Sequence, residues 1–494
     1  MSNLREYIDK FNANDKEYIK TYIGNDRAYD FVYENFPRLS CPDKTIEETF
    51  AFRSWTLRKH VKPTPDGYIL TEFLPDVSWA GKYNSINAAL CHHLNEARWL
   101  KNSKIGLDLI DFFLDEKGSS YKYSTPALYE MYRFYKLTGN EKLLSERLGK
   151  FERYVKTFEK DHLLQCGLFR SQGCYDAMEF SISGVRQGST EEMWGIRPTM
   201  NAEMYGAYTT LAQIFEDCGD LKKACAYRNR AAELKEKFIS ACYAEDFFKA
   251  VHLPLNRLEN GATYKDILPE CNVKEEIGYI PFIYDCYISG QEKCFKYLFD
   301  TNVFQSEYGI TTAERSTPRF LYKVDHECSW NGYIWPYATS QTITAMINLL
   351  NKGCRDEYIN NERLYELIET YAKTHYLTEN GKTVNWIDEV LSPSDGRWYS
   401  RDVLRAWGWQ AFRGGYERGK DYNHSTFIDL VICGLLGVKT DREQLTVEPR
   451  IQKRWDWFAL ENLSYRGGVY NVYYDKTGEK FGKGKGVIAE RVSK

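Results

Sequence analysis

The chain has 494 residues, 43% hydrophobic and 27% charged, which is enough for a large globular core. Lysine and arginine (66) nearly balance aspartate and glutamate (69), and the two signs are mixed along the sequence, which argues against a nucleic-acid partner. No run approaches 18 apolar residues and residues 1–10 include acidic side chains, so neither a membrane association nor a secretory peptide is expected, and the protein is predicted to be cytoplasmic.

Helical periodicity dominates the first 440 residues. Apolar residues recur at helical spacing over residues 205–219, Gly219 provides a C-terminal cap, and Asp220 begins a second amphipathic helix that runs to about residue 243. Similar helical pairs are predicted for residues 126–139 with 140–160 and for residues 336–352 with 357–374. The irregular intervals between the pairs argue against a regular helical repeat.

Long loops rich in Gly, Trp and Asp separate the helical pairs. The four most unusual loops are residues 71–87, 167–197, 306–336 and 385–398. Long loops in a compact domain are usually functional when they are too aromatic to be disordered. Each of these ends near a predicted helix start, so a ring of helical pairs would gather them on one face as a candidate active site.

The pattern changes after Gly437. Alternating apolar and polar residues, separated by Gly and Asp turns, predict short strands at residues 444–449, 458–463, 469–474 and 486–491. This tail is too short to be expected as an independent domain. We therefore predict a helical catalytic domain over residues 1–439 and a β-rich segment over residues 440–494 packed on it.

The cysteines and histidines give little sign of a disulfide or a metal site. The 13 cysteines run from Cys41 to Cys433 without a CxxC pair, and their number is odd. They are predicted to be reduced thiols that act as small apolar residues. The adjacent His92 and His93 would point in different directions on a helix, so they make a weak metal site.

The densest aromatic segment runs from Ser329 to Tyr337 and contains two tryptophans, two tyrosines and Asn331. Aromatic faces beside a hydrogen-bonding amide suit a sugar ring, which has C–H faces and hydroxyl edges. The alternative is a rigid corner between loop and helix, with Pro336 at the first helical position. Both interpretations can hold, because a binding loop needs a rigid mount.

Carboxylates occur among aromatic and apolar neighbours on two of the loops. Asp176 and Glu179 lie in the second loop, where burial would raise a carboxyl pKa, and Glu389 lies in the fourth, between Trp386 and Trp398. Asp176 can alternatively be a residue that ties its loop to a helix start. Two carboxylates on separate loops are what glycoside hydrolysis requires.

These loops together resemble those of the glycoside hydrolase family 63 and mannosylglycerate hydrolase-like glycosidases, from about Thr45 to the end. Residues 330–336 resemble the family's Trp-Arg-Gly-Pro-x-Trp-Pro loop, residues 173–181 its Gly-x-Asp-x-Ser loop, and residues 389–396 its Glu-x-Tyr-x-Pro-x-Thr-Gly loop. Asn331 departs from the family's Arg. Residues 401–421 form an insertion-like segment.

The resemblance implies an all-α fold, an (α/α)6 toroid with a small C-terminal β-rich appendage, and an inverting mechanism. Asp176 would be the general acid and Glu389 the general base. Substrate-binding residues are expected among the following: Trp79, Lys82, Tyr83, Asn84, Glu179, Glu307, Tyr308, Trp330, Asn331, Trp335 and Trp386. No metal or organic cofactor is required by such chemistry.

The expected substrate is a small oligosaccharide or glycoside with an α-linked hexose, of the α-glucoside or α-mannoside type. Because an amide replaces a guanidinium at Asn331, the pocket is expected to favour neutral hydroxyls over a carboxylate such as glycerate. Two other classes stay open. A sugar epimerase or isomerase on the same toroid would use His424 or His326 as a base, and a helical scaffold would have no chemistry.

Overall fold

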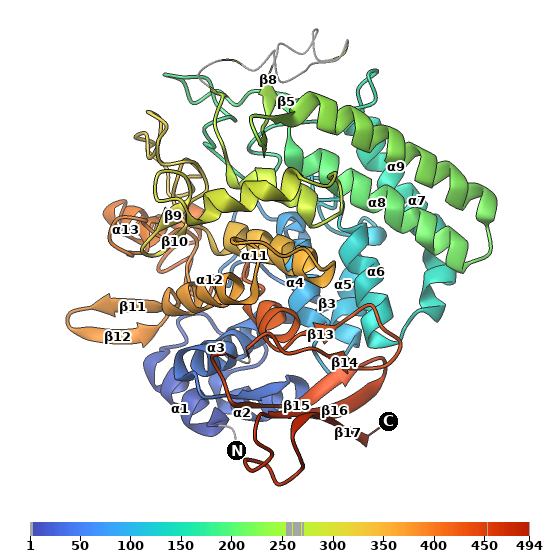
Figure 1. Ribbon diagram of the computed structural model, residues 1–494. Helices are drawn as coiled ribbons and strands as arrows, with labels where there is room; N and C mark the ends of the chain where they lie inside the picture. Colours follow the sequence, from blue (N-terminus) through green and yellow to red (C-terminus); the bar gives the residue numbers. More distant parts are fainter. Residues whose placement is uncertain (1–2, 253–258, 260–267, 269–270, 452, 494) are drawn as a thin grey trace.

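The computed structural model describes residues 3–252, 259, 268, 271–451 and 453–493, and its bulk is helical (Figure 1). The α-helices are α1 Leu4–Asn14, α2 Ala28–Asn35, α3 Lys44–His60, α4 Leu90–Ala97, α5 Lys104–Leu114, α6 Leu128–Thr138, α7 Lys142–His162, α8 Pro198–Asp217, α9 Leu221–Cys242, α11 Pro336–Asn351, α12 Asn361–Lys373, α13 Tyr399–Ala406 and α14 Phe427–Asp429. α14 continues into the wider helical turn η9 Leu430–Leu435. The longer 3₁₀ segments are η6 Glu276–Phe282 and η7 Gln291–Phe299.

The three predicted helical pairs are confirmed as α6–α7, α8–α9 and α11–α12. Their ends follow local chemistry. Gly139 and Gly219, which follow α6 and α8, have φ values of 74° and 85°. These values lie in the left-handed region, which glycine adopts with the least steric strain because it has no Cβ. The Asp220 side chain accepts a hydrogen bond from the Lys223 backbone N–H at the start of α9, as expected for a helix N-cap.

Six helical elements contact one another in a closed circuit. α4 packs on α6, α6 on α8, α8 on η6, η6 on α11, α11 on η9, and α14 returns to α4. Further helices pack outside this circuit: α7 on α6, α9 on α8, α12 on α11 and α3 on α14. Buried Leu, Ile, Phe and Met side chains of the inner elements belong to one core that also includes residues of the outer helices and of the C-terminal sheet.

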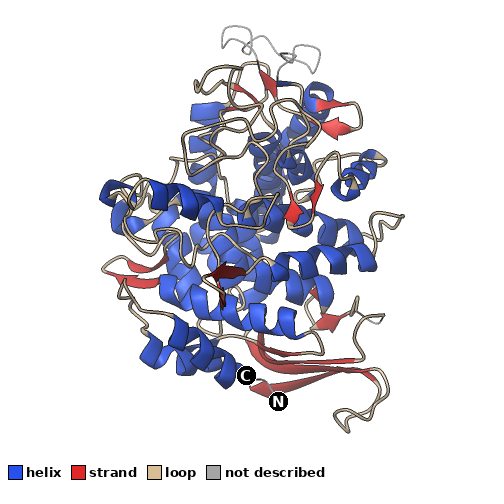
Figure 2. Cartoon of the chain, turned by 90° about the vertical axis from the view of Figure 1, so that its left-hand side faces the viewer, coloured by secondary structure: helices blue, strands red, loops and turns tan. Residues whose placement is uncertain are grey.

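The C-terminal strands form one antiparallel sheet at the end of the molecule where both termini lie (Figures 1 and 2). Its order is β1–β15–β16–β17, with β1 Arg38–Ser40, β15 Trp457–Tyr465, β16 Gly468–Asp475 and β17 Gly486–Ser493. The last three strands match the sequence prediction. β1 does not: it comes from the N-terminal part, and Leu39 pairs with Leu460.

The remaining strands are short and mostly form hairpins within the loops. They are β2 Val61–Thr64 with β3 Gly67–Leu70, β4 Arg170–Ser171 with β5 Gly195–Ile196 and β8 Val251–His252, β6 Tyr243–Ala244 with β7 Phe247–Phe248, β9 Gln305–Ser306 with β10 Gly309–Ile310, β11 Tyr376–Glu379 with β12 Lys382–Asn385, and β13 Val438–Lys439 with β14 Thr446–Val447. The predicted strand at residues 444–449 is thus reduced to β14.

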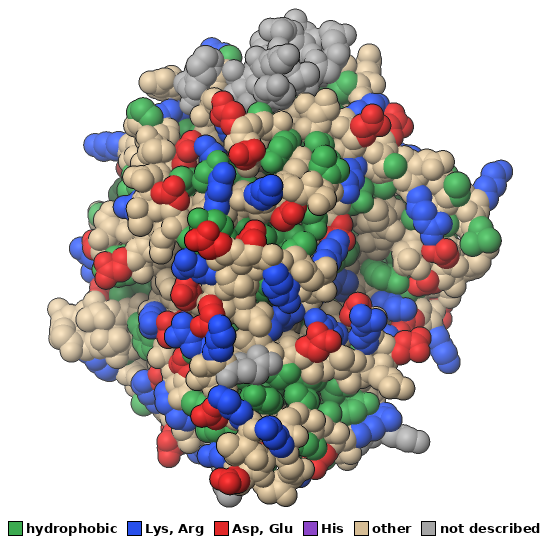
Figure 3. All heavy atoms as spheres, viewed as in Figure 1, with side chains coloured by type: hydrophobic (Ala, Val, Ile, Leu, Met, Phe, Trp, Pro, Cys, Tyr) green, Lys and Arg blue, Asp and Glu red, His purple; other side chains and the backbone are tan. Residues whose placement is uncertain are grey.

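Basic and acidic side chains are interspersed on the face seen in Figure 3. Within the described residues, no helix has the length and apolar character needed to cross a membrane.

Candidate active site

One cavity of about 340 Å³ receives residues from all four of the long loops. Its aromatic lining residues are Phe73, Trp79, Tyr123, Trp335, Phe412 and Tyr422, and its carboxylates are Glu72, Glu179, Glu327 and Glu389. Aromatic faces beside hydrogen-bonding groups are typical of a sugar-binding site. The prediction that the loops converge on one face is confirmed for these side chains.

Glu179 lies in a backbone segment that the surrounding loop constrains. Its neighbours Ala177 and Phe180 have φ values of 58° and 61°, which side chains with a Cβ rarely adopt. The Glu179 carbonyl accepts a hydrogen bond from the Trp330 N–H at 3.1 Å, and Phe180 N–H donates to Glu192 Oε1 at 3.2 Å. Both bonds hold the peptide group between Glu179 and Phe180, and the Glu179 side chain lines the cavity.

Within the part of the chain that the structure describes, no lysine or arginine is recorded in a hydrogen bond or ion pair with the Glu179 carboxyl group. Burial raises its pKa, and the nearby carboxylates of Glu72 and Glu327 act in the same direction. The thiol of Cys328 donates to Glu179 Oε2 at 3.1 Å, which opposes the shift. The environment of Glu179 therefore favours the protonated form, which a general acid needs.

Glu389 differs from Glu179 in that its carboxyl group has a guanidinium partner. Arg418 donates to Glu389 Oε2, and the backbone N–H of Glu389 donates to Asp388 Oδ1 at 2.8 Å. Burial and the neighbouring carboxylates of Glu327, Glu72 and Asp388 raise the pKa of Glu389 well above its usual value, and the guanidinium of Arg418 opposes that shift. The charge-assisted contact with Arg418 favours the ionised carboxylate, which can accept a proton.

Arg418 connects two carboxylates of the cavity, because it also contacts Glu327 Oε1 at 3.2 Å. Glu327 receives a second guanidinium, from Arg413. Although burial acts to raise the pKa of Glu327, these arginines hold it below its usual value. Among the described lining residues both arginines are thus already paired with carboxylates.

Glu72 has a third kind of environment in the cavity, with a tyrosine and a histidine as its partners. Its Oε1 accepts a hydrogen bond from the Tyr422 hydroxyl at 3.3 Å and lies 3.0 Å from His424 Nε2. Burial raises the pKa of Glu72 to about 8 and lowers that of His424 well below its usual value. A protonated carboxyl beside a neutral imidazole can both donate to and accept from sugar hydroxyls.

Asp176 lies in the same loop as Glu179 but is not among the residues that line the cavity. Its side chain is 1% exposed, and Arg197 Nε donates to Oδ2 at 2.6 Å. Hydroxyl groups supply three more donors: Ser124 at 2.6 Å, Ser171 at 2.5 Å and Thr199 at 2.5 Å. This arrangement ties the loop to the start of α8, as the alternative interpretation of Asp176 expects.

The four predicted tryptophans take different places. Trp79 and Trp335 line the cavity. Trp330 stacks on Trp335 with ring centroids 4.3 Å apart and is 3% exposed, so it supports Trp335 from behind. Trp386 is buried away from the cavity, where its Nε1 donates to Asp388 Oδ2 at 3.4 Å.

The polar residues predicted beside Trp79 serve the loop instead of the cavity. Lys82 Nζ and the Tyr83 hydroxyl both donate to Asp66 Oδ2, at 2.5 Å and 2.9 Å. Asn84 accepts from the Val77 N–H at 3.1 Å and donates to the carbonyls of Phe73 and Pro75. Asn84 thereby fixes the turn that presents Trp79.

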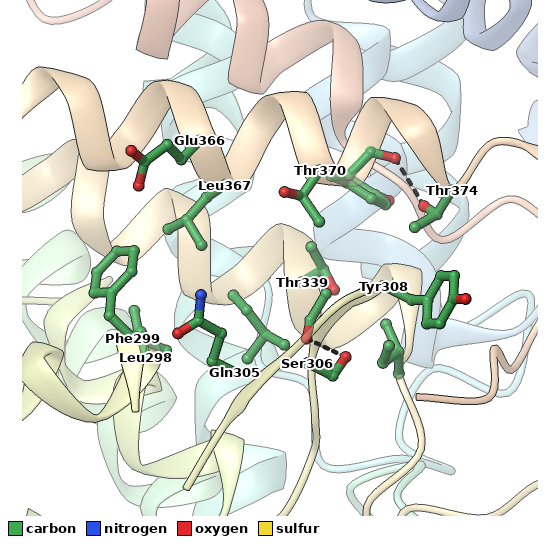
Figure 4. Close-up of a pocket in the computed structure, with 14 residues that line it drawn as sticks. Leu298, Phe299, Gln305, Ser306, Tyr308, Thr339, Glu366, Leu367, Thr370 and Thr374 are labelled. Carbon is green, nitrogen blue, oxygen red and sulfur yellow. Dashed lines mark hydrogen bonds between the residues drawn. The ribbon is translucent and has the colours of Figure 1, made fainter. Parts of the chain in front are cut away.

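Glu307 and Tyr308 lie on the β9–β10 hairpin, away from the cavity described above. Glu307 is exposed, and Tyr308 lines a separate cavity of about 60 Å³ between this hairpin and helices α11 and α12 (Figure 4). Tyr308 also lies against Gly396 in the fourth loop, where a Cβ would meet its ring at 2.5 Å. The hairpin thus supports the loop that carries Glu389.

Asn331 is completely buried, and its Nδ2 donates to the Tyr322 carbonyl at 2.7 Å. It does not line the cavity. The expectation of substrate preference therefore cannot rest on a direct contact between Asn331 and the sugar.

The insertion-like segment at residues 401–421 contributes residues that the sequence interpretation did not assign: Phe412, Arg413 and Arg418. Glu327 was missed as well. The available signal was the His-Glu-Cys run directly before the aromatic segment at residues 329–337, together with two arginines in a loop with many aromatic residues. The ion pairs of the two arginines with Glu327, and of Arg418 with Glu389, depend on tertiary contacts, which the spacing of residues in the sequence does not show.

A helical fold with a loop-built cavity of aromatic side chains and carboxylates is the arrangement expected of a glycosidase. The sequence model of the mannosylglycerate hydrolase MGH1-like glycoside hydrolase domain matches residues 82–425. The chain belongs to this glycoside hydrolase family. A second model, of the C-terminal domain of glycosyl hydrolase family 65, matches residues 438–490. The comparison with curated protein sequences finds no match.

Solved structures extend the likeness. A structure described as a sialidase superposes with a TM-score of 0.86 at 31% identity, over 98% of this chain and 42% of that one, so the chain spans less than half of that protein. The GH78 family rhamnosidase of Bacillus sp. GL1 gives 0.56 at 12% identity, over 89% and 40% of the two chains. The GH63 mannosylglycerate hydrolase from Thermus thermophilus, in complex with Tris and D-glycerate, gives 0.51 at 9% identity, over 77% and 99%. At these low identities the last two share the fold.

Proposed function

We propose that the protein hydrolyses an α-linked hexoside with inversion, and that Glu179, in place of Asp176, is the general acid. The observation that carries the proposal is the contrast between two carboxyl groups in one cavity. Among the described residues no lysine or arginine contacts the Glu179 carboxyl group, whose pKa is raised by burial, whereas Arg418 donates to Glu389 and opposes the rise in pKa that burial causes there. Two carboxyl groups with opposite protonation are what glycoside hydrolysis uses.

In this mechanism Glu179 gives its proton to the glycosidic oxygen as the bond from that oxygen to the anomeric carbon breaks. A water molecule attacks the anomeric carbon from the opposite face and loses a proton to Glu389. Glu179 ends ionised and Glu389 protonated, and exchange with solvent restores both. The two carboxyl groups should lie roughly 6.5–9.5 Å apart to leave room for the water.

The architecture fits this activity. The circuit of α4, α6, α8, η6, α11 and α14 with η9, surrounded by outer helices, supports the expected (α/α)6 toroid with residues 440–494 as its appendage. In such a toroid the loops at one end of the ring form the pocket. The described residues of the C-terminal segment are absent from the lining of the cavity.

The substrate is proposed to be neutral. Four glutamates and two arginines line the cavity, and both arginines contact glutamates, so neither is free to pair with the carboxylate of a sialoside or a glycosylglycerate. The likeness to a sialidase and to a mannosylglycerate hydrolase does not outweigh this charge pattern. An α-glucoside or α-mannoside remains the proposed class.

The proposal is tested with α-hexosyl fluorides and α-linked disaccharides of glucose and mannose, by measuring released sugar. The wild type should hydrolyse both the fluoride and the disaccharide of at least one of the two hexoses. Glu389→Gln should lose most turnover, by a factor of about 10² to 10⁴, because an amide cannot accept the proton from water. Glu130→Gln is the matched control, since Glu130 is a buried glutamate outside the cavity whose pKa burial also raises. Turnover of none of these substrates would refute the proposed function.

A further inference from the structure

A large apolar side chain is exposed at the rim of the cavity. Phe412 lines the cavity and is 64% exposed, in contrast to the buried aromatic residues Phe73, Trp335 and Tyr422 deeper in the lining. Its ring has a contact with the guanidinium of the next residue, Arg413, 5.6 Å from the ring centroid, and among the described residues no aromatic ring pairs with it. An exposed ring that borders a binding cavity is available to a ligand.

Phe412 has a fixed place despite its exposure. It lies in the one-turn segment η8 Ala411–Arg413, and the next residue, Arg413, is held at two points. Its guanidinium lies over the Trp407 ring at 4.6 Å from the centroid and pairs with Glu327 inside the cavity. These contacts position the backbone that carries Phe412.

The segment that carries Phe412 reaches both sides of the proposed reaction centre. At one end Arg418 contacts Glu389, the proposed base. At the other end Arg413 Nη1 lies 3.5 Å from His326 Nε2, and the His326 ring packs on Phe180, which directly follows Glu179, with ring centroids 5.1 Å apart. The contact of Arg413, the residue next to Phe412, thus leads to the loop that carries Glu179, and the leaving group departs on the side of the acid.

From this geometry we infer that Phe412 forms a subsite for a second, neutral sugar ring, on the leaving-group side of the bond that is cut. This inference rests on the function proposed above and adds the nature of the leaving group. A phenyl ring offers an apolar face to the C–H face of a sugar ring. The substrate is then a disaccharide or longer oligosaccharide.

A neutral sugar fits the rim better than an acidic leaving group such as glycerate. Arg413 is the cation nearest to Phe412 in sequence, and it is already paired with Glu327 and packed on Trp407. A carboxylate would have to displace Glu327 from a guanidinium, and the other arginine of the lining, Arg418, is paired with Glu389 as well. Phe412 itself offers no hydrogen-bond donor.

The test compares two substrates with the same hexose at the non-reducing end: an α-linked disaccharide, and an α-hexosyl fluoride, which has no second ring. Phe412→Ala should lower kcat/KM for the disaccharide by about twofold to tenfold and leave the fluoride unchanged, because stacking on an aromatic ring is worth roughly 0.5–1.5 kcal/mol and about 1.4 kcal/mol is tenfold. Phe412→Trp and Phe412→Tyr should retain the wild-type preference. Tyr33→Ala removes an exposed aromatic residue that does not line the cavity and is the matched control.

Equal losses on both substrates would overturn the subsite, because the change would then act on the reacting sugar or on the fold. No loss on either substrate would also overturn it. An α-hexosyl glycerate hydrolysed by the wild type as efficiently as the disaccharide would refute the choice of a neutral ring. If the wild type hydrolyses no hexoside, the proposed function fails first and the subsite with it.

Discussion

Replacing Glu179 by glutamine should remove most turnover on an unactivated disaccharide and leave the stability of the fold nearly unchanged. Glutamine has no proton to give to a leaving oxygen, and general acid catalysis is typically worth a factor of about 10² to 10⁴. Its amide oxygen can still accept the hydrogen bond that Cys328 donates to Glu179 Oε2. The free energy of unfolding should therefore change by about 1 kcal/mol or less.

Asp176→Asn should instead lower the stability of the fold strongly and the turnover of folded protein less. Asp176 and Arg197 form an ion pair whose side chains are 1% and 0% exposed, and three hydroxyls complete the acceptor positions of the carboxylate. Loss of the charge leaves a buried guanidinium without its counterion, which typically costs about 3–5 kcal/mol. Activity per folded molecule should fall less than in Glu179→Gln, because the cavity residues keep their chemistry.

The assay is the leaving-group dependence of kcat/KM, measured beside urea unfolding for both variants. Glu179→Gln should lose activity on the disaccharide and keep much more of it on the α-hexosyl fluoride, because departing fluoride needs less protonation than an alkoxide. Asp176→Asn should lose a similar factor on both substrates. If instead Asp176→Asn shows the selective loss and Glu179→Gln does not, the acid is Asp176 and the argument from cavity geometry is wrong.

Two further predictions concern ionisation. Arg418→Gln should move the acid limb of the profile of kcat/KM against pH to higher pH by about 1–3 units, because the guanidinium lowers the pKa of Glu389. Arg418→Lys should move the acid limb less, and the basic limb should stay in place in both variants. An unmoved acid limb would contradict the role of Arg418. Glu276, outside the cavity, has a pKa raised by burial to about 8, so the folded state binds its proton more tightly than the unfolded state, and the contribution of Glu276 to stability should fall as pH rises from about 4.3 to 8. Glu276→Gln should therefore gain stability relative to the wild type by roughly 1.4 kcal/mol per pH unit over that range in urea unfolding, and a pH-independent difference would refute the assigned shift.

The helical pairs and the C-terminal strands could be predicted because their signals are local. Gly139 and Gly219 end helices where a left-handed residue is needed, and the alternation at residues 469–474 has the period of a strand. β1 could not be predicted in the same way, because Leu39 pairs with a residue more than 400 positions away. Nothing in residues 38–40 alone indicates that partner.

The site shows the same limit at the level of single side chains. Sequence places Asp176 and Glu179 in one loop, but only the folded loop, with Ala177 and Phe180 in the left-handed conformation, shows that Glu179 and not Asp176 lines the cavity. The family resemblance identified the loop at residues 173–181, and the Gly-x-Asp-x-Ser pattern of the family indicated Asp176 as the general acid. Arg418, 29 residues after Glu389, reaches it only through the folded insertion-like segment.

The central claim is that one carboxylic acid and one carboxylate act from opposite faces of an α-hexoside with a water molecule between them. The most direct measurement is the anomeric configuration of the first sugar released, followed by proton NMR before mutarotation. The account predicts that the β-anomer appears first from an α-linked substrate, and that Glu389→Gln removes its formation. First release of the α-anomer would show retention and a covalent intermediate, and would contradict the roles given to Glu179 and Glu389.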